Sequence, residues 1–410
     1  GLLANSDLKW ETTISRNLGL DFGFLNNRIN GSLEIYWNTT KDLLMAVPVD
    51  NTTGYSYQFQ NFGKTSNRGI ELSLNFDVIN KGDFRFNIGA IYNYNRNKLD
   101  ELPNADQYLY SSYWGSSSLV PTNDYMFVEG KAIGLVRGFV SEGFYTVNDF
   151  RYENGQYILK EGIPDITKAL TATYMHPFNI PNGQTAFPGA AKFRDVNNSG
   201  TVDLDDATCL GEVMPRHTGS FQLNFNYKNF DLSSNFNWTA GGKVYNVAAM
   251  INASGQEFDG IGAQRTSWVA DTYKVYNVNS SGDLYAVTDP NELNALNANA
   301  KYHLPYHQSG ITSSEWLEDG SYLRLQTLTL GYTLPHTVLN KIHIEKLRIY
   351  LTATNLFTIT GYSGIDPEVN ATPTGQSGFY SNLRVFPTLN MDFGTYPRAR
   401  TFTLGANITF

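Results

Sequence analysis

The most constraining feature of this 410-residue sequence is a two-residue alternation of apolar and polar side chains that recurs in hairpin after hairpin. The apolar positions of one hairpin are Phe221, Leu223, Phe225 and Tyr227, followed beyond a turn at Asn229 by Leu232, Phe236 and Trp238. The positions between them carry mainly amides and hydroxyls. Because successive side chains of a strand point to opposite faces, each segment has one apolar and one polar face.

The same alternation is found in other parts of the chain. It occupies residues 18–24, 29–37, 70–76, 84–97 and 396–410, with turn signals at Asn26-Asn27 and at 80–83. Strands of this kind, with lipid on one face and water on the other, are typical of membrane β-barrels. A hairpin of a water-soluble β-sandwich can show the same alternation, but its recurrence in hairpin after hairpin favours an all-β, antiparallel transmembrane barrel.

Composition agrees with such a fold. Charged residues make up 17% of the chain and aromatic residues 14%, which suits a large surface that does not face bulk water. No apolar run approaches the ~18 residues of a membrane helix, whereas a barrel strand needs only ~10. The net charge of −8 and the lack of a basic stripe in the sequence argue against a nucleic-acid partner.

A metal-loop spacing precedes the first hairpin described above. Positions 1, 3, 5, 7, 9 and 12 of a calcium loop are filled by Asp195, Asn197, Ser199, Thr201, Asp203 and Asp206. Gly200 stands at position 6, where the chain must turn sharply, but position 12 is Asp instead of the usual Glu. The spacing predicts a structural Ca²⁺ ion. The alternative is a turn that its own Asn and Asp side chains hold together through hydrogen bonds to the backbone.

Two long stretches, residues 101–194 and 247–320, lose the alternation and are predicted to be extracellular loops, with a short helix near 291–300. Four aromatic residues in the first stretch are candidates for contact with a sugar or peptide ligand, by ring stacking and hydrogen bonding. These candidates are Tyr108, Tyr110, Tyr113 and Trp114. Ordinary loop packing uses the same residue types.

Three groups of chemically active side chains are interpreted as structural. Glu11 stands at the start of a strand with no second carboxylate assigned to it by any motif. His303 and His307 have a proline between them and are interpreted as loop histidines. Asp366 and Glu368 are interpreted as carboxylates that shape a loop. Because an acid/base pair requires opposed carboxylates across a substrate, no catalytic residue is predicted and the chain is not expected to be an enzyme.

Short pieces spread over nearly the whole chain resemble the SusC-like (SusC/RagA type) TonB-dependent outer-membrane transporters. These pieces are SDLKWE at 6–11, Gly19-Leu20-Asp21, Asp42-Leu43-Leu44, 134–145, Met214-Pro215-Arg216, 227–232, Tyr245-Asn246, 321–335, 347–357 and 361–368. The end of the chain is similar to the signal that outer-membrane barrel assembly recognises, with outward positions Phe402, Leu404, Ile408 and Phe410.

The resemblance implies an importer of glycans or peptides in the outer membrane of a Gram-negative bacterium of the Bacteroidetes type. It also implies a SusD-like surface lipoprotein as a lid, and coupling to the TonB complex. Residues 1–410 are then expected to be the C-terminal barrel portion, ten to fourteen strands of a 22-stranded plugged barrel, because nothing here resembles the plug domain or the TonB box. The alternative is a secreted, calcium-stabilised all-β module that binds glycans. A third reading, an extracellular hydrolase, lacks an acid/base pair.

Overall fold

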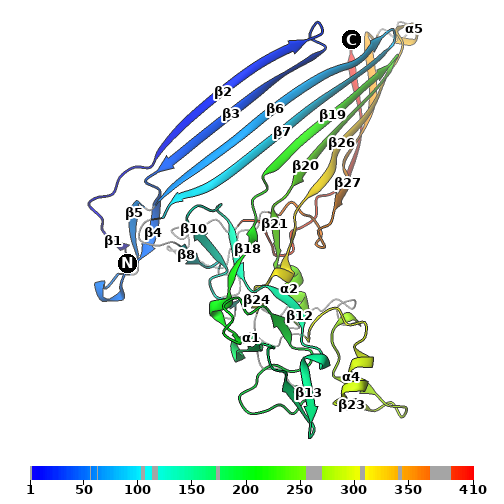
Figure 1. Cartoon of the computed structure of the whole chain (residues 1–410). Coiled ribbons are helices and arrows are strands. Elements are labelled where there is room, and N and C mark those ends of the chain that lie inside the picture. The colour runs from blue at the N-terminus through cyan, green and yellow to red at the C-terminus, as the bar shows by residue number, and fades with distance from the viewer. Residues whose placement is uncertain are drawn as a thin grey trace.

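The computed structural model describes residues 2–55, 57–61, 63–102, 107–112, 119–171, 176–254, 270–304, 310–339, 344–369 and 389–410. These residues form two parts: a tall curved sheet, which we call the wall, and a loop body packed at one end of it (Figure 1). The loop body consists of the described residues of the long connections between wall strands, together with residues 2–11, which precede the first of these strands. The prediction of an all-β antiparallel fold is therefore confirmed.

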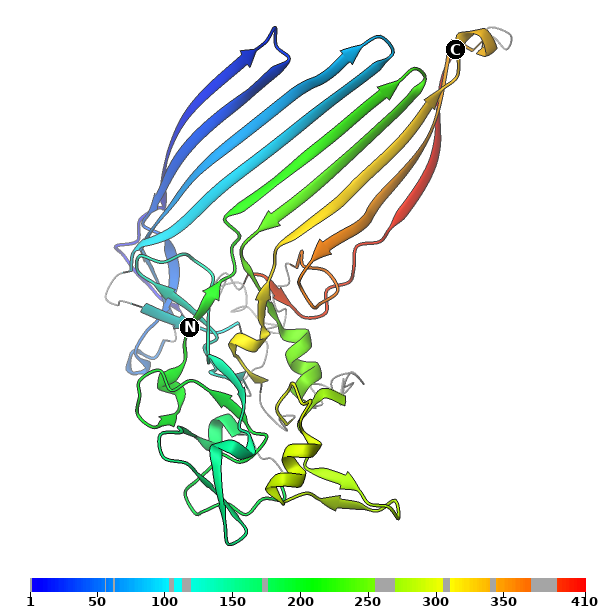
Figure 2. The same cartoon turned by 45° about the vertical axis from the view of Figure 1, so that its right-hand side comes forward.

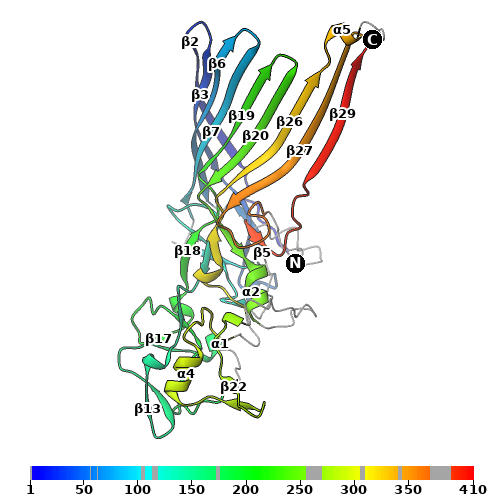
Figure 3. The ribbon, with the colours of Figure 1, turned by 90° about the vertical axis from the view of Figure 1, so that its right-hand side faces the viewer.

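The wall is a single sheet of nine strands in the order β2-β3-β6-β7-β19-β20-β26-β27-β29, and every neighbouring pair is antiparallel. Its strands are β2 (Thr12–Phe24), β3 (Ile29–Lys41), β6 (Lys64–Lys81), β7 (Phe84–Glu101), β19 (His217–Tyr227), β20 (Phe230–Ala240), β26 (Tyr322–Thr333), β27 (Lys346–Thr360) and β29 (Thr401–Thr409). The sheet is open, with β2 and β29 at separate edges (Figures 2 and 3). The described residues thus hold nine wall strands, fewer than the ten to fourteen expected, because the long connections fold into the loop body.

The pairing register gathers the apolar positions on one face, which we call the outer face. One cross-strand row joins Leu232, Leu330, Leu351 and Leu404, and another joins Leu20, Leu33 and Leu72. Side chains in these rows remain open to the surroundings: Leu20 is 60% exposed and Leu404 is 76% exposed. A contiguous apolar surface of this size is rare on a protein that faces only water, so the outer face requires an apolar environment.

The opposite, inner face of the wall is polar. Its side chains bond to one another across strands: Tyr36 donates to Asn95 at 3.0 Å, and Asn237 donates to Gln326 at 2.6 Å. Because a one-residue slip in register would exchange the two faces, the apolar pattern fixes the register strongly.

Connections at the two ends of the wall differ in length. At one end the strands are joined by residues 25–28, 82–83 and 228–229, and by a connection that contains helix α5 (His336–Leu339). Asn26, Asn27, Gly82 and Lys228 adopt positive φ in these turns, which Gly and Asn do readily. The predicted turns are therefore confirmed. At the other end, the described residues of the connections 42–63, 102–216, 241–321 and 361–400 belong to the loop body.

The loop body is built from small sheets that alternation cannot reveal, because most of its strands span only two to five residues. They are β1 (Leu2–Leu3), β4 (Leu44–Pro48), β5 (Tyr57–Asn61), β8 (Gln107–Tyr110), β9 (Leu119–Val120), β10 (Tyr125–Val128), β11 (Leu135–Gly138), β12 (Ser141–Phe144), β13 (Phe150–Glu153), β14 (Gln156–Leu159), β15 (Asp165–Ile166), β16 (Ala191–Phe193), β17 (Thr201–Val202), β18 (Thr208–Glu212), β21 (Lys243–Asn246), β22 (Tyr276–Val278), β23 (Leu284–Ala286), β24 (Gly310–Ile311), β25 (Leu317–Asp319) and β28 (Met391–Asp392). The stretch 101–194 was predicted to be a long loop without alternation, and the structure folds its described residues into several of these small sheets.

Helices are short in the loop body. They are α1 (Lys168–Thr171), α2 (Val247–Ser254), α4 (Pro290–Leu296) and the 3₁₀ turns η1 (Asn51–Thr53), η3 (Val147–Asp149), η4 (Leu204–Asp206) and η5 (Ser314–Trp316). The predicted helix near 291–300 corresponds to α4, which begins one residue earlier and ends at Leu296. Asp289 caps it by accepting from the amides of Asn291 and Glu292. Within the described residues, no helix is long and apolar enough to cross a membrane.

Two large apolar cores hold the loop body together, beside a small third cluster of Val244, Tyr362 and Val369. One lies around Phe139, Tyr145 and Tyr157 in its distal part, and the other lies around Tyr125, Tyr245 and Trp316 next to the wall. Both cores combine residues from connections that are far apart in the sequence. The loop body is thus a packed structure that stands at one end of the polar inner face (Figure 1).

Candidate functional site

The inner face of the wall is the first candidate for contact with a solute. A shallow hollow of about 530 Å³ lies over β2, β3, β6 and β7, and a second of about 340 Å³ lies over β6, β7, β19 and β20. Polar side chains in them include Asn17, Glu34, Tyr36, Asn38, Asn67, Glu71, Asn95, Ser73, Asn75, Ser220, Gln222 and Asn235. Most of these groups are neutral amides and hydroxyls, with the carboxylates of Glu34 and Glu71 among them, and they suit contact with hydrated, hydroxyl- or amide-rich molecules.

An ion pair fixes the inner face near the short turns. Arg348 on β27 donates to both carboxylate oxygens of Asp231 on β20, at 2.9 and 2.5 Å, across the intervening strand β26. Gly331 on β26 lies beneath this pair, and a Cβ there would stand 2.5 Å from an Asp231 oxygen and 2.4 Å from an Arg348 nitrogen. A Cβ at position 331 would push these two side chains out of the bridge, which accounts for the glycine of the Leu-Gly-Tyr step within the 321–335 segment.

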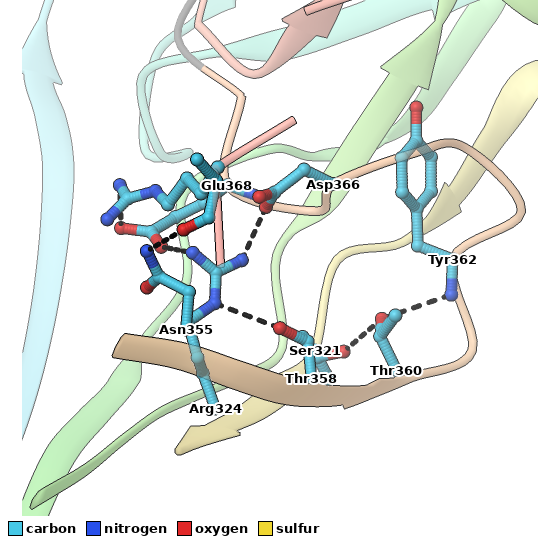
Figure 4. Close-up of polar contacts among 10 residues, drawn as sticks. Ser321, Arg324, Asn355, Thr358, Thr360, Tyr362, Asp366 and Glu368 are labelled. Carbon is cyan, nitrogen blue, oxygen red and sulfur yellow. Dashed lines mark hydrogen bonds and ion pairs between the residues drawn. The ribbon is translucent and has the colours of Figure 1, made fainter. Parts of the chain in front are cut away.

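A buried ion cluster lies where the wall meets the loop body (Figure 4). Arg324 of β26 is 2% exposed. Its guanidinium donates to Asp366 at 2.6 Å, to Glu368 at 2.9 Å and to the Thr358 hydroxyl at 3.0 Å. Glu368 also pairs with Arg398 at 2.8 Å. Since each of the three guanidinium nitrogens donates one hydrogen bond and two of the acceptors are carboxylates, the buried charge of Arg324 is paired.

The cluster fixes the segment that follows β27. The Tyr362 hydroxyl donates to buried Asp392 at 2.6 Å, and the amide of Ser363 donates to Glu318 at 2.7 Å. Asn246 donates to the same Glu318 at 2.7 Å. These contacts explain why the 361–368 and Tyr245-Asn246 pieces belong to one pattern: the fold brings them to one junction.

The Asp366–Glu368 pair was predicted to shape a loop, and the contacts confirm that interpretation. Sequence reasoning missed their partners, Arg324 and Arg398. A signal did exist in the sequence, because Arg324 interrupts a strand of apolar and hydroxyl residues and a buried arginine requires acid partners. The identity of those partners could not be read, since they lie 42 and 44 residues away in the sequence.

The predicted calcium loop occupies residues 195–206 on the surface of the loop body. Its side chains bond to the loop's own backbone: Asp195 accepts from the amides of Ser199 and Gly200 at 3.1 and 2.7 Å. Asp206, which is 0% exposed, accepts from the amides of Val196 and Asp203 at 2.7 and 2.8 Å.

Further bonds complete this loop. Asn197 accepts from the Ser199 amide at 2.9 Å, the Ser199 hydroxyl donates to the Thr201 carbonyl at 2.8 Å, and Asp203 accepts from the Asp205 amide at 2.8 Å. Over the described part of the chain, no three His, Cys, Asp or Glu side chains converge as metal ligands. The self-supported turn accounts for the observed geometry, and calcium binding stays a prediction.

The four aromatic candidates have different placements. Tyr110 is 3% exposed in the core beside the wall, where it stacks on Phe127 at 4.7 Å. This burial corrects the expectation that Tyr110 meets a ligand, because its ring supports the loop body instead. Tyr108 is half-buried beside the same core. Tyr113 and Trp114 lie outside the described residues.

Next to Tyr110, a buried carboxylate has an unusual proton affinity. Asp124 is 0% exposed and accepts from the amide and hydroxyl of Ser112 at 2.8 and 2.5 Å. Burial raises the pKa of Asp124 to about 6, while the two Ser112 hydrogen bonds lower it. The carboxylate therefore changes charge near neutral pH within the packed core of the loop body.

Other side chains singled out in the sequence have structural roles. Glu11 precedes β2 and accepts from the amide of Leu44 at 2.7 Å, as expected of a residue at a strand start. His303 is buried, with its Nε2 3.7 Å from a carboxylate oxygen of Glu315. Burial raises the pKa of Glu315, and His303 lowers it. His307 lies outside the described residues.

The residues of the predicted assembly signal lie on the outer face of β29, except that Phe410 follows its last residue. Phe402, Leu404 and Ile408 are 64%, 76% and 49% exposed, and Phe410 is 87% exposed. β29 is an edge strand, so this apolar row borders the open side of the sheet. Recognition by an assembly machinery stays a prediction.

An apolar outer face, a polar inner face, short turns at one end and a packed loop body at the other define the class of protein. They are the features of an outer-membrane barrel wall with its extracellular loops. Residues 1–356 match the family model described as "TonB dependent receptor-like, beta-barrel". The chain therefore belongs to the TonB-dependent receptor-like β-barrel family. Since this is a family of receptors and transporters, the prediction that the chain is not an enzyme is confirmed.

Curated relatives agree with this assignment. The chain is 30% identical over 407 residues to TonB-dependent receptor P3 of Formosa agariphila, covering 99% of the chain and 35% of the relative. It is 27% identical over 414 residues to TonB-dependent receptor SusC of Bacteroides thetaiotaomicron, covering 99% of the chain and 32% of the relative. The SusC-like resemblance is thus confirmed. The chain spans about a third of the length of these relatives.

Solved structures support the fold. The structure of the RagAB peptide transporter matches 99% of this chain and 36% of its own chain, with a TM-score of 0.65 and 22% identity. The "open-open" state of the RagAB peptide importer matches with a TM-score of 0.61 and 23% identity. At these identities the likeness shows a shared fold.

Proposed function

We propose that this chain is the C-terminal part of the barrel of a SusC-type TonB-dependent importer in a bacterial outer membrane. One observation carries the proposal: nine antiparallel strands present a continuous apolar face outward and a polar, amide-rich face inward. Lipid on the outside and an aqueous interior account for both faces at once. In this role the inner face contacts the cargo, and the loop body stands on the extracellular side.

The cargo class that we propose is an oligosaccharide or an oligopeptide. The inner face offers amides and hydroxyls, which bind both classes by hydrogen bonds. The resemblance to the SusC-like transporters supports both classes alike, because it implies an importer of glycans or peptides. A SusD-like surface lipoprotein would close the extracellular side, and TonB would act through a plug domain in a longer polypeptide, of which residues 1–410 form the C-terminal barrel portion.

A secreted glycan-binding module remains the competing function from the sequence. The outer face argues against it, because a module in water would expose rows such as Leu20, Leu351 and Leu404 to solvent. The two proposals differ in where the protein is found. Only an importer is expected in the outer-membrane fraction, with a denatured mass well above the 45.9 kDa of this chain.

Uptake by living cells tests the importer. Cells that lack the full-length gene should fail to accumulate one class of fluorescent oligomer, sugar or peptide, and complementation should restore uptake. A protonophore should abolish uptake in the complemented cells, because TonB coupling depends on the inner-membrane proton gradient. Unchanged accumulation of both classes, or a protein recovered only from the medium, would refute the proposal.

We also propose that the 195–206 loop binds a structural calcium ion. The spacing of Asp, Asn, Ser and Thr side chains at the ligand positions of a calcium loop supports this proposal. The alternative is the self-supported turn seen in the structure. Hydrogen exchange of the full-length protein, in calcium and in chelator, separates the two. Calcium should slow hydrogen exchange of the amides in residues 195–206. Equal exchange rates in calcium and in chelator would refute calcium binding and favour the self-supported turn.

A further inference from the structure

The outer face carries a row of arginines that the sequence does not reveal. Arg16 on β2 pairs with Trp37 on β3, Trp37 pairs with Arg68 on β6, and Arg68 pairs with Arg96 on β7. Directly paired residues of an antiparallel sheet project from the same face. We call these four residues the arginine row. Leu18, two residues from Arg16, confirms that the row lies on the apolar outer face.

The arginine row marks the end of the apolar surface on these four strands. From the row toward the short turns, the outer positions are Leu18, Leu20, Phe22, Phe24, Ile35, Leu33, Gly31, Ile29, Ile70, Leu72, Leu74, Phe76, Tyr94, Tyr92, Ala90 and Ile88. Toward the loop body they are Ile14, Thr12, Thr39, Lys41, Ser66, Lys64 and Lys98. Arg16 precedes Phe24 by eight residues, about 26 Å along a strand, and at a tilt of ~35–45° this length spans about 18–21 Å of an apolar band ~25 Å tall.

The arginines of the row have no counter-charge within the described residues. Lys64 pairs with Glu101 and Lys98 with Asp100, but none of the observed ion pairs or side-chain hydrogen bonds involves Arg16, Arg68 or Arg96. All three side chains are exposed. Like charges directly opposite on neighbouring strands destabilise a sheet, and Arg68 and Arg96 are such a pair. A counter-ion from outside the chain would remove this repulsion.

The place of the row identifies the counter-ion. In a membrane wall, the boundary of the apolar band lies at the depth of the lipid head groups, where tryptophans such as Trp37 are favoured. The guanidinium group binds phosphate through two parallel hydrogen bonds. The loop body stands beyond this end of the wall, which places the row in the extracellular leaflet (Figure 1).

We infer that the three arginines of the row, with Lys41 beyond it, bind phosphate groups of a phosphorylated lipid in the extracellular leaflet. The inference rests on the proposed function, because only a wall within a membrane presents this face to lipid. The site is local: on the other strands, the outer positions near this end of the wall include Trp238, Leu323 and Ile359 and carry no arginine or lysine within the described residues. One flank of the barrel thus holds a specific lipid while the rest of the wall contacts acyl chains.

The test measures lipid that stays with the full-length protein purified from outer membranes in mild detergent. Phosphorylated glycolipid per protein is counted by native mass spectrometry and phosphorus assay, with purified lipid A as the added probe. The variant Arg16→Gln/Arg68→Gln/Arg96→Gln should retain about tenfold less lipid A. Replacement of the same three residues by lysine, which keeps the charge, should retain more than the glutamine variant.

Lys81→Gln is the matched control, because Lys81 lies on the same face at the opposite end of the wall. It should retain lipid A like the wild type. Equal retention by the triple glutamine variant would overturn the inference, and so would tight binding of free inorganic phosphate that displaces lipid A. If the triple variant fails to assemble, Arg68→Gln alone should lower retention, and retention like that of the wild type would overturn the inference. A wild-type protein absent from the membrane would instead refute the proposed function.

Discussion

Removal of Arg324 should detach the segment that follows β27 from the wall. Arg324 is 2% exposed, and its guanidinium makes two charged contacts, to Asp366 at 2.6 Å and to Glu368 at 2.9 Å. Glu368 keeps Arg398, but Asp366, whose side chain is 8% exposed, loses its only ion-pair partner among the described residues. Breaking one partner out of a buried pair costs about 3–5 kcal/mol, because the remaining charge stays desolvated. Arg324→Ala is therefore expected to lower the free energy of unfolding by about that amount.

The measurement is denaturant unfolding of the full-length protein in lipid vesicles, together with hydrogen exchange of residues 361–369. Arg324→Lys should be intermediate, since an ammonium keeps the charge but cannot replace the planar fork. Arg194→Gln, which breaks a solvent-exposed pair with Glu142, should cost at most ~1 kcal/mol. If Arg324→Ala costs no more than Arg194→Gln and leaves exchange of 361–369 unchanged, the cluster does not hold the junction.

Three further predictions concern the wall, the loop body and the predicted metal loop. Leu223→Arg, on the outer face, should destabilise the barrel by ~2–4 kcal/mol if the residue lies at the bilayer midplane. Asn224→Arg, on the inner face, should leave the free energy of unfolding nearly unchanged. Equal free energies of unfolding for the two variants in vesicles would contradict the assignment of faces. Burial raises the pKa of Asp124 to about 6 from an ordinary 3.8, so between these pH values the folded state keeps a proton that the unfolded chain releases. The contribution of protonated Asp124 to stability is therefore complete below pH ~4 and is lost as the pH rises through 6. Asp124→Asn should flatten that pH dependence, measured as resistance of the loop body to proteolysis, and an unchanged profile would exclude Asp124 as its origin. Asp206→Ala removes the acceptor of several loop amides and should speed hydrogen exchange across residues 195–206 at every calcium concentration, whereas an effect seen only in calcium would assign the residue to metal binding alone.

The wall follows closely from the sequence because its signal is local. An alternation of apolar and polar residues is enough to predict a strand, and the residues between two such segments predict the turn. β2, β3, β6, β7, β19 and β20 each contain a segment predicted in this way, and the structure extends them by a few residues at their ends. The extensions, such as 12–17 of β2, carry fewer apolar residues, since they lie beyond the apolar band.

The loop body could not be predicted in the same way. Its strands are too short to show a period, and its cores join residues such as Tyr125, Tyr245 and Trp316, which come from different connections. Tyr110 is an example. From the sequence alone, an aromatic residue in a loop is a candidate for ligand contact, and only the structure shows which residues surround it. Burial, and not residue type, decided its role.

The sequence by itself determined the class of this protein: an antiparallel wall with one apolar and one polar face, interrupted by long loops, of the SusC-like kind. Only the tertiary structure decided which charged groups meet. Arg324 reaches Asp366 and Glu368 through the path of the segment after β27, and Arg16, Arg68 and Arg96 come into one row through the register of four strands. The physical reason is that an apolar alternation specifies faces locally, whereas the alignment of distant charges depends on turn lengths and bulges summed over the whole sheet.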